Sequence, residues 1–269
     1  MELLRFLYHT MPGRLILKPL TAPIVSNISG RLLDHPLSKV FIPAFIRKYN
    51  IDMKEFEDIS YESFNEFFCR RIRPEFRPIE RDPLTLISPC DGFLSVYPIS
   101  NDLVVPVKGC EYSISSLLRS PSIAKRYEGG LCMVFRLCVN NYHRYCFPDG
   151  GKVSSLRHIP GLFHTVRPVA LEAFPVFTEN SREYCLLKTE SFGTLLLMEV
   201  GAMLVGRICN HKVEGEVLRG AEKGYFQYGG STVIVLVQKD RLRLFDSFKD
   251  ALEEPVLMGV GLGRAIKEN

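Results

Sequence analysis

The sequence lacks any long apolar run. Nowhere do about 20 apolar residues follow one another, which is the length that a helix needs to cross a bilayer. The first residues also lack the uninterrupted apolar core of a cleavable secretory signal, because Arg5, Pro12 and Arg14 interrupt the stretch. The sequence therefore predicts neither a spanning helix nor a secretory leader.

Metal-binding and redox patterns of cysteine are also missing. None of the eight cysteines forms a CxxC pair, and no Cys/His spacing matches a zinc site. Most of them lie beside apolar residues, as in LCMVFRLCVN (131–140), which indicates buried free thiols in a reducing cytosol. The net charge of +4 is mild and comes without dense basic blocks. We therefore expect no metal site and no nucleic-acid partner.

What is present is an ordinary globular composition. Hydrophobic residues make up 46% of the 269 positions and charged residues 24%, values that are typical of folded domains. The length suffices for one large domain or two small ones with a buried core. No internal repeat or low-complexity tract is visible, so the organisation has to be read from changes of pattern along the chain.

Residues 1–72 have a helical pattern. Apolar residues recur at mixed spacings of three and four, and prolines at positions 12, 19, 23 and 36 divide the pattern into short helices. Basic residues outnumber acidic ones at the start of this stretch, and short, basic, apolar helices suit a membrane interface. The same helices could instead cap the core of the main domain or pair two subunits. The residues alone leave these interpretations open.

A second helical pattern covers residues 53–74, with two serines available as caps and a proline as its stop. The proline-rich stretch RPEFRPIERDP (73–83) is the best boundary in the chain. We therefore expect an N-terminal helical, membrane-associating segment over residues 1–75 and a second domain over residues 76–269.

Beyond this connector the pattern changes. Short apolar runs such as GLCMVFRLCV (130–139) and STVIVLVQ (231–238) alternate with Gly, Pro, Asn and Asp, which is typical of strands separated by turns. Residues 84–240 should form strands with one helical interruption at 113–127, and the tail has one weak helical pattern at 245–254. The predicted fold class is α+β: an N-terminal helical segment followed by a β-rich antiparallel or mixed sandwich or barrel-like catalytic domain.

Four stretches contain residues that could carry chemistry, and each has an ordinary structural alternative. They are SPCDG (88–92), NNYHRYCFPDGG (140–151), GLFHTVRPVAL (161–171) and GYFQYGGSTVIVLVQ (224–238). Asp91 precedes a glycine as in a common turn, and His143 and His164 resemble hydrogen-bonded core histidines. The glycine pair before Ser231 fits a tight hairpin. Taken singly, each stretch is more often structural than catalytic.

The Gly230–Ser231 bond also permits self-cleavage. Gly230 has no Cβ, so its backbone reaches conformations closed to other residues and its carbonyl is approachable. Attack by the Ser231 hydroxyl, with a base to take its proton, would replace the amide by an ester. β-Elimination would then leave a dehydroalanine, and hydrolysis would turn it into a pyruvoyl group and ammonia. Serine suits this chemistry because its Cβ carries a leaving group.

The combination and order of these stretches resemble the markers of the phosphatidylserine decarboxylase family. The matching stretches are FNEFFCRRIRPEFRPI, SPCDG, YHRYCFPDGG, FTENSREY, FGTLLLMEVGAMLVGRI and GYFQYGGST. They run from about residue 60 to 235, and the N-terminal helices resemble those of bacterial members.

The resemblance implies a pyruvoyl enzyme that cleaves itself between Gly230 and Ser231. The products would be a β chain of residues 1–230 and an α chain of residues 231–269. Ser231 would become the pyruvoyl cofactor, and neither a metal nor pyridoxal phosphate would be needed.

The resemblance also implies an Asp–His–Ser constellation for self-cleavage. This sequence matches it at two of the three positions. Asp91 and Ser231 match, but the usual second histidine of the YHRxH motif is Cys146 in this sequence. His143 could act as the base instead, His164 could approach from a neighbouring strand, or Cys146 could act as a thiolate with a lowered pKa. A chain that does not process itself is the remaining alternative.

The implied reaction is decarboxylation of phosphatidylserine to phosphatidylethanolamine, with His143 returning a proton to the substrate. The expected partners are phosphatidylserine, a membrane surface, the β and α chains of the same precursor, and a second copy in a homodimer. The expected location is peripheral, on the cytoplasmic side of the cell membrane. Two alternatives remain: a pyruvoyl decarboxylase of a soluble amino acid, and a non-processing lipid-binding homologue.

Overall fold

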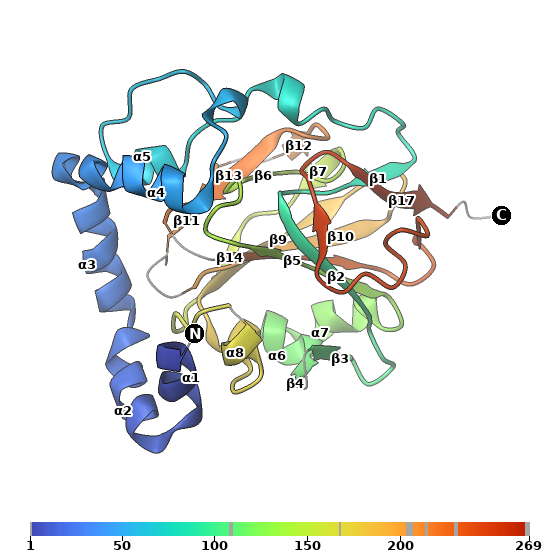
Figure 1. Ribbon diagram of the computed structural model, residues 1–269. Coiled ribbons are helices and arrows are strands. Elements are labelled where there is room, and N and C mark those ends of the chain that lie inside the picture. The colour runs from blue at the N-terminus through green and yellow to red at the C-terminus, as the bar shows by residue number, and fades with distance from the viewer. Residues whose placement is uncertain are drawn as a thin grey trace.

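A computed structural model describes residues 2–107, 110–166, 168–202, 207–212, 215–228 and 231–266. Short helices come first and form the left flank of the molecule, and two 3₁₀ turns near residues 54 and 75 lie along its top (Figure 1). They are α1 (Glu2–His9), α2 (Met11–Leu20), α3 (Pro23–Asp34), η1 (Pro36–Phe41), α4 (Ile42–Tyr49), η2 (Met53–Glu55), α5 (Phe64–Phe68) and η3 (Pro74–Phe76). Pro12, Pro23 and Pro36 each lie in the first turn of one of these elements, where proline fits best. The prediction for Pro19 is wrong, because Pro19 lies inside α2, next to its last residue.

The helix predicted over residues 53–74 is wrong for most of its length. Only α5 is α-helical there, with Ser63 as its N-cap. The flanking chain is extended, because Phe56 forms an antiparallel bridge with Ile72. The aromatic residues of α5 pack into a cluster with Phe45, so tertiary packing decides the conformation of this segment over its helical pattern.

One large antiparallel sheet forms the middle layer. Its strands are β2 (Gly92–Pro98), β5 (Leu131–Leu137), β7 (Gly151–Val153), β8 (Arg157–Ile159), β9 (Arg182–Lys188), β10 (Thr194–Val200), β12 (Gly215–Val217), β14 (Ser231–Val237) and β16 (Glu254–Val256). Their order is β12-β7-β9-β10-β14-β5-β2-β16, with β8 beside β9. All seven residues of β14 are buried. Its continuous apolar run fits a strand covered on both faces.

Smaller sheets complete the β structure. They consist of β1 (Thr85–Ile87) with β17 (Gly261–Ala265) and β15 (Leu242–Leu244), of β11 (Ile208–Asn210) with β13 (Glu222–Phe226) and β6 (Arg144–Cys146), and of β3 (Val104–Val107) with β4 (Cys110–Ser113). The first two cover one face of the large sheet (Figure 1). Between them lies a cluster that we call the sheet-side core, which includes Phe135, Leu197, Val233, Tyr145 and Phe226.

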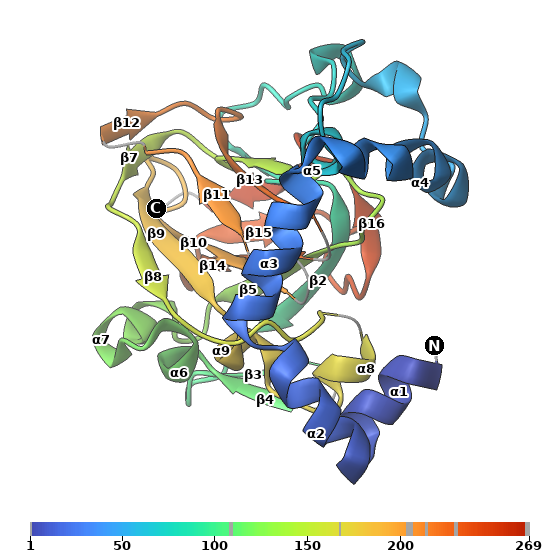
Figure 2. The ribbon, with the colours of Figure 1, turned by 90° about the vertical axis from the view of Figure 1, so that its left-hand side faces the viewer.

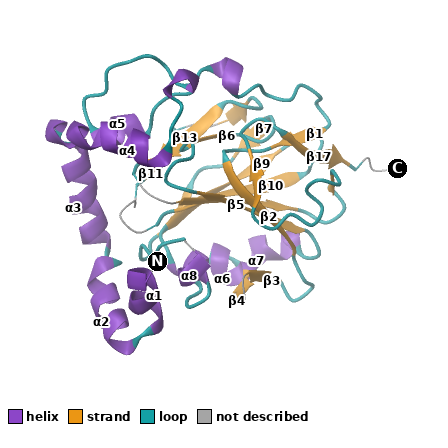
Figure 3. Cartoon of the chain, in the orientation of Figure 1, coloured by secondary structure: helices purple, strands orange, loops and turns teal. Residues whose placement is uncertain are grey.

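Helices cover the other face of the large sheet (Figure 3). They are α6 (Ile114–Leu118), α7 (Pro121–Ala124), η4 (Lys125–Tyr127), α8 (Pro168–Leu171) and α9 (Val176–Glu179). With α1 and α2 they enclose the helix-side core, which includes Tyr8, Val134, Met198 and Ile234. The α+β fold is thus confirmed as a layered sandwich, and its sheets are open along the described ranges, without the closure of a barrel.

Two local predictions have different outcomes. The helical interruption at 113–127 is confirmed and is divided at Pro121. The weak helix at 245–254 is wrong, because this stretch forms turns and then β16. Val96 N donates to Ala251 O at 2.9 Å, so pairing with β2 holds the tail extended.

The N-terminal helices lie against one end of the large sheet. Figure 2 faces this side and shows α3 in front of the sheet. Tyr8 and Leu17 enter the helix-side core, while Phe45 and the phenylalanines of α5 pack with Tyr228, shortly before β14. Of the described helices, none is both long and apolar enough for a bilayer crossing. The domain division at residues 75 and 76 stays a prediction.

Candidate active site

Ser231 is the first residue of the central strand β14. It pairs with Leu137 of β5, and the next residue, Thr232, pairs with Val200 of β10. Because side chains alternate along a strand, Ser231 faces the same side as Val233, which belongs to the sheet-side core. Ser231 is fully buried, and its Oγ makes no hydrogen bond with any residue described. Leaving a buried hydroxyl unsatisfied costs about 1–3 kcal/mol, so its presence here calls for a functional reason.

The chain that leads to Ser231 is held by α5. Tyr228 N donates to Asn65 Oδ1 at 3.2 Å, and the Tyr228 ring lies 5.1 Å from that of Phe68. Gly229 and Gly230 are outside the described residues, so the prediction for Gly230 as the cleavage position is untouched by the structure. The contacts of Tyr228 nevertheless fix the approach to the predicted bond.

His143 lies close to this approach. It immediately precedes β6, is fully buried, and its ring centroid is 4.1 Å from that of Phe68, which also contacts Tyr228. Its carbonyl accepts a hydrogen bond from Phe226 N at 2.9 Å. Nδ1 is 2.8 Å from Asn141 O, and because a carbonyl only accepts, Nδ1 must donate. In the neutral ring, Nε2 is therefore the basic nitrogen.

Asp91 precedes β2 at the same end of the sheet, and its carboxylate is fully engaged. Arg77 Nε donates to Oδ1 at 2.9 Å and Arg77 Nη2 to Oδ2 at 2.7 Å, while Met258 N donates to Oδ1 at 2.8 Å. The described residues supply no histidine to this carboxylate. Asp91 thus forms a closed, bidentate ion pair, the strongest kind of carboxylate contact.

Cys146 ends β6 and is buried. Burial raises the pKa of its thiol to about 12, and the nearby charge of Asp91 acts in the same direction. Its Sγ is 4.0 Å from Ser88 O. The thiol is neutral at physiological pH, so the geometry disfavours the thiolate alternative.

His164 lies elsewhere in the fold. Its Nδ1 is 3.3 Å from the Tyr8 hydroxyl and its Nε2 is 3.3 Å from Glu179 Oε2, and its ring stacks on Phe174. Burial lowers the pKa of the imidazole to about 4. Tyr8 belongs to the helix-side core and Phe174 packs against it, whereas Ser231 faces the other side of the sheet.

A buried polar cluster on the Ser231 face was not predicted from the sequence. Glu199 of β10 is fully buried and pairs with Val233 of β14. Lys223 Nζ donates to Glu199 Oε2 at 2.7 Å, and Asn210 Nδ2 donates to the same oxygen at 3.0 Å. The signal in the sequence was a single glutamate in the apolar run LLLMEVGA, which places a charge inside the sheet.

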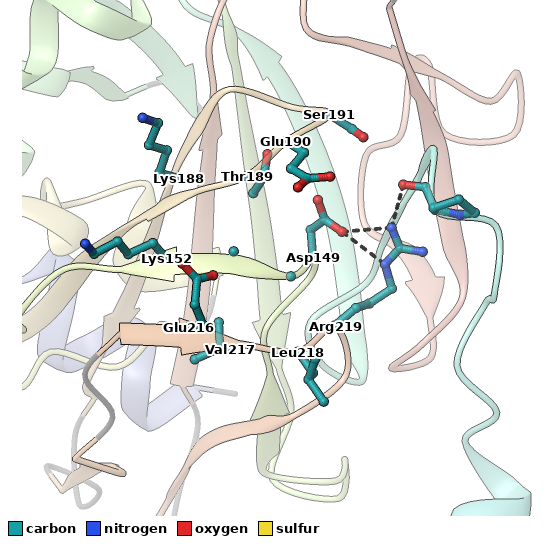
Figure 4. A pocket seen from close by; sticks show the side chains of 13 residues that line it. Asp149, Lys152, Lys188, Thr189, Glu190, Ser191, Glu216, Val217, Leu218 and Arg219 are labelled. Atoms are coloured by element: carbon teal, nitrogen blue, oxygen red, sulfur yellow. Dashed lines mark hydrogen bonds and ion pairs between the residues drawn. The ribbon is translucent and has the colours of Figure 1, made fainter.

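Cavities differ in their distance from this site. One of about 260 Å³ is lined by Cys146, Arg77 and Met258 and so adjoins Asp91. Another, of about 670 Å³, lies between α3, η1 and Tyr228. A third, of about 520 Å³, is lined by the edge strand β12 and its neighbour β7 and holds the Asp149–Arg219 ion pair (Figure 4). Only the first two border the Ser231 end of the sheet.

Comparison with known proteins gives a consistent result. The model of the family described as phosphatidylserine decarboxylase matches residues 64–264. Phosphatidylserine decarboxylase proenzyme 2 of Clostridium acetobutylicum is 38% identical, over 97% of this chain and 91% of its own length. The proenzymes of Ruminiclostridium cellulolyticum and Clostridium perfringens strain SM101 are 39% and 41% identical, over 98% and 88% of this chain and 92% and 84% of their own lengths. This chain belongs to the phosphatidylserine decarboxylase family.

Proposed function

We propose that this chain is a self-processing phosphatidylserine decarboxylase whose catalytic carbonyl derives from Ser231. Membership of the family makes the chain a decarboxylase, and relatives named as proenzymes indicate autocatalytic processing. The observation that carries the proposal is the fully buried Ser231, whose Oγ has no hydrogen-bond partner in the described part of the chain.

The surroundings of Ser231 fit a pyruvoyl group. Backbone pairing with β5 and β10 fixes β14 on both sides, and the sheet-side core excludes water from the face of Ser231. Conversion of Ser231 would remove its unsatisfied hydroxyl. A pyruvoyl group at this position would supply the electron-accepting carbonyl that decarboxylation of an amino acid headgroup requires.

His143 is the residue that we propose moves a proton during decarboxylation. The contact of Nδ1 with Asn141 O holds the ring in the tautomer with a basic Nε2. The Phe68 ring, tilted against the imidazole, restricts the orientation of the side chain, and the hydrogen bond from Phe226 N to His143 O holds its backbone. A buried, oriented imidazole is suited to general acid–base catalysis.

The N-terminal helices support a lipid substrate over a soluble amino acid. Large apolar side chains of α1, α2 and α3 are exposed: Leu3, Phe6, Met11, Leu15, Ile16, Leu20, Ile24, Ile28 and Leu32. Basic residues on the same helices would favour an anionic leaflet. The cavity of about 670 Å³ beside Tyr228 joins these helices to the approach of Ser231. We therefore propose a peripheral location on the cytoplasmic side of the cell membrane.

Vesicle flotation tests the membrane proposal. We expect binding to phosphatidylglycerol vesicles, and loss of binding when Leu15 and Ile24 are both replaced by Glu. Replacing Leu218 and Leu252 by Glu is the matched control, because these side chains are equally exposed on other surfaces. Equal flotation of both double variants would contradict the proposal. The expected homodimer belongs to the same proposal, and light scattering would test it.

Decarboxylation of phosphatidylserine by the purified wild type is the test of activity. We expect CO₂ release from the lipid, none from free serine, and none from the Ser231→Ala variant. Release from free serine at a comparable rate would favour the soluble amino acid alternative, and no release from either would contradict the proposed function.

A further inference from the structure

We propose that Glu199, held by Lys223 and Asn210, is the base that takes the proton of Ser231 during self-cleavage. This inference rests on the proposed function and addresses a gap in it. The family motif has a histidine where this chain has Cys146, and the thiol of Cys146 is buried and neutral. Another group must therefore accept the proton.

The register of the sheet brings Glu199 to Ser231. Glu199 pairs with Val233, and Ser231 is two residues before Val233 on the same face of β14. The two residues are therefore diagonal cross-strand neighbours. Such neighbours have Cα atoms about 7–8 Å apart, which is within reach of a long side chain.

The hydrogen bonds of Glu199 leave one oxygen available. Lys223 and Asn210 both donate to Oε2, whereas Oε1 is buried and has no hydrogen bond with the described residues. Buried carboxylates normally satisfy both oxygens. The unsatisfied Glu199 Oε1 and Ser231 Oγ thus lie on one face of the sheet, inside one apolar core.

The other members of the cluster orient the carboxylate. Lys223 Nζ donates to Asn210 Oδ1 at 2.7 Å as well as to Glu199, and Asn210 Nδ2 also donates to Glu183 Oε2 at 2.9 Å. The cluster joins β10 to β11 and β13, the small sheet whose last strand leads toward Ser231. The contact between Lys223 Nζ and Glu199 Oε2 compensates charge inside an apolar surrounding, where a lone charge would be strongly disfavoured. Lys223 and Asn210 are therefore positioning residues.

The proton balance of the reaction closes without a co-reactant other than water. Glu199 Oε1 accepts the Oγ proton as Oγ bonds to the Gly230 carbonyl carbon, and this proton passes to the Ser231 nitrogen as the C–N bond breaks. In the resulting ester, Glu199 then accepts the Cα proton of residue 231 while the Cβ–Oγ bond breaks and Gly230 leaves as a carboxylate. Water hydrolyses the dehydroalanine to the carbonyl and ammonia. Nothing is oxidised or reduced by an external reagent.

Glu199→Gln tests this role on freshly synthesised precursor. The first-order rate of cleavage, followed by intact mass, should fall by about 10²–10⁴-fold, the usual contribution of a general base. Asp149→Asn is the matched control, because Asp149 is also a buried carboxylate paired with a cation, Arg219, but lines the cavity away from the Ser231 end of the sheet. It should cleave at nearly the wild-type rate. Alkaline pH should speed cleavage of Glu199→Gln, because hydroxide then replaces the missing base.

A second variant distinguishes a loss of folding from a loss of the cleavage chemistry. Glu199→Leu with Lys223→Met removes both buried charges without leaving one unpaired, which such cores tolerate. It should unfold at a temperature close to that of Ser231→Ala and remain uncleaved. Wild-type cleavage in Glu199→Gln or in the double variant, or equal slowing in Asp149→Asn, would overturn the inference. An uncleaved wild type would overturn the proposed function itself.

Discussion

Two buried ion pairs lie at the Ser231 end of the large sheet, and they differ in one respect. In the pair of Arg77 and Asp91, both carboxylate oxygens accept hydrogen bonds. In the pair of Lys223 and Glu199, one oxygen accepts two and the other none among the described residues. The closed pair leaves no carboxylate oxygen to accept a proton, whereas the open pair leaves one on the same face of the sheet as Ser231. The comparison predicts that the closed pair serves stability and the open pair serves chemistry.

The largest effect should come from His143→Asn. This variant distinguishes the catalytic step that His143 serves from the step that Glu199 of the open pair serves. If Glu199 accepts the Ser231 proton and His143 serves the substrate, this variant should still cleave itself. Its decarboxylation rate should fall by about 10²-fold or more, because the basic Nε2 is lost. Intact mass and CO₂ release on the same sample measure the two steps. Loss of cleavage together with decarboxylation would assign the base role to His143 instead.

The closed pair should show its main effect on stability. Asp91→Ala, made in the uncleavable Ser231→Ala chain, leaves Arg77 buried with only Glu55 nearby. The free energy of unfolding in urea should fall by about 3 kcal/mol, as for other broken buried pairs. The control is Glu75→Ala, which breaks the exposed pair with Arg73 and should cost about 0.5 kcal/mol or less. Equal costs for the two variants would show that burial of the closed pair contributes nothing.

The contact between His164 and Glu179 allows the dependence of stability on pH to be tested. Burial lowers the pKa of His164 to about 4, whereas the unfolded imidazole titrates near pH ~6.5. Between these values the unfolded chain binds the proton and the folded chain does not, so stability must fall as the pH is lowered through this window. We expect a loss on the order of 2 kcal/mol, because the unfolded imidazole binds a proton in this window that the buried one does not.

Urea unfolding of the uncleavable Ser231→Ala chain at pH 7 and pH 4.5 measures this loss. The same chain carrying His164→Gln should show a smaller decrease, because the glutamine does not titrate. A decrease with His164 no larger than that of the chain carrying His164→Gln would contradict the lowered pKa.

The smallest effect should come from Cys146→Ala, next to the closed pair. Because burial and the Asp91 charge keep the thiol neutral, it contributes no base catalysis. The cleavage rate should change by less than about threefold, against the 10²–10⁴-fold expected of a base. A larger loss in the mass time course would restore Cys146 as a candidate for the base.

The sequence predicted the parts of the fold that depend on local pattern. Prolines marked the starts of the N-terminal helices, and the apolar run at 231–238 marked the buried central strand. Residues 53–74 were misassigned because pairing of Phe56 with Ile72 overrides a helical pattern. That pairing joins distant positions and leaves no local trace.

In the candidate site too, residues marked by a local motif were predicted and contacts between distant residues were not. Ser231, Asp91 and His143 were visible from motifs, and their catalytic roles stay predictions. The partner of Asp91 was not visible, because Arg77 lies in a connector whose fold no local pattern dictates. Glu199 and Lys223 are 24 residues apart on strands of different sheets, so only the packing of the two sheets reveals the pair.

The conversion of Ser231 is most directly tested by the intact mass of the purified wild-type protein, with Ser231→Ala beside it. We predict two chains for the wild type, residues 1–230 and 231–269, the shorter with a ketone in place of its N-terminal amine, and one chain for the variant. A wild type that decarboxylates phosphatidylserine as a single unbroken chain of 269 residues would contradict the conversion.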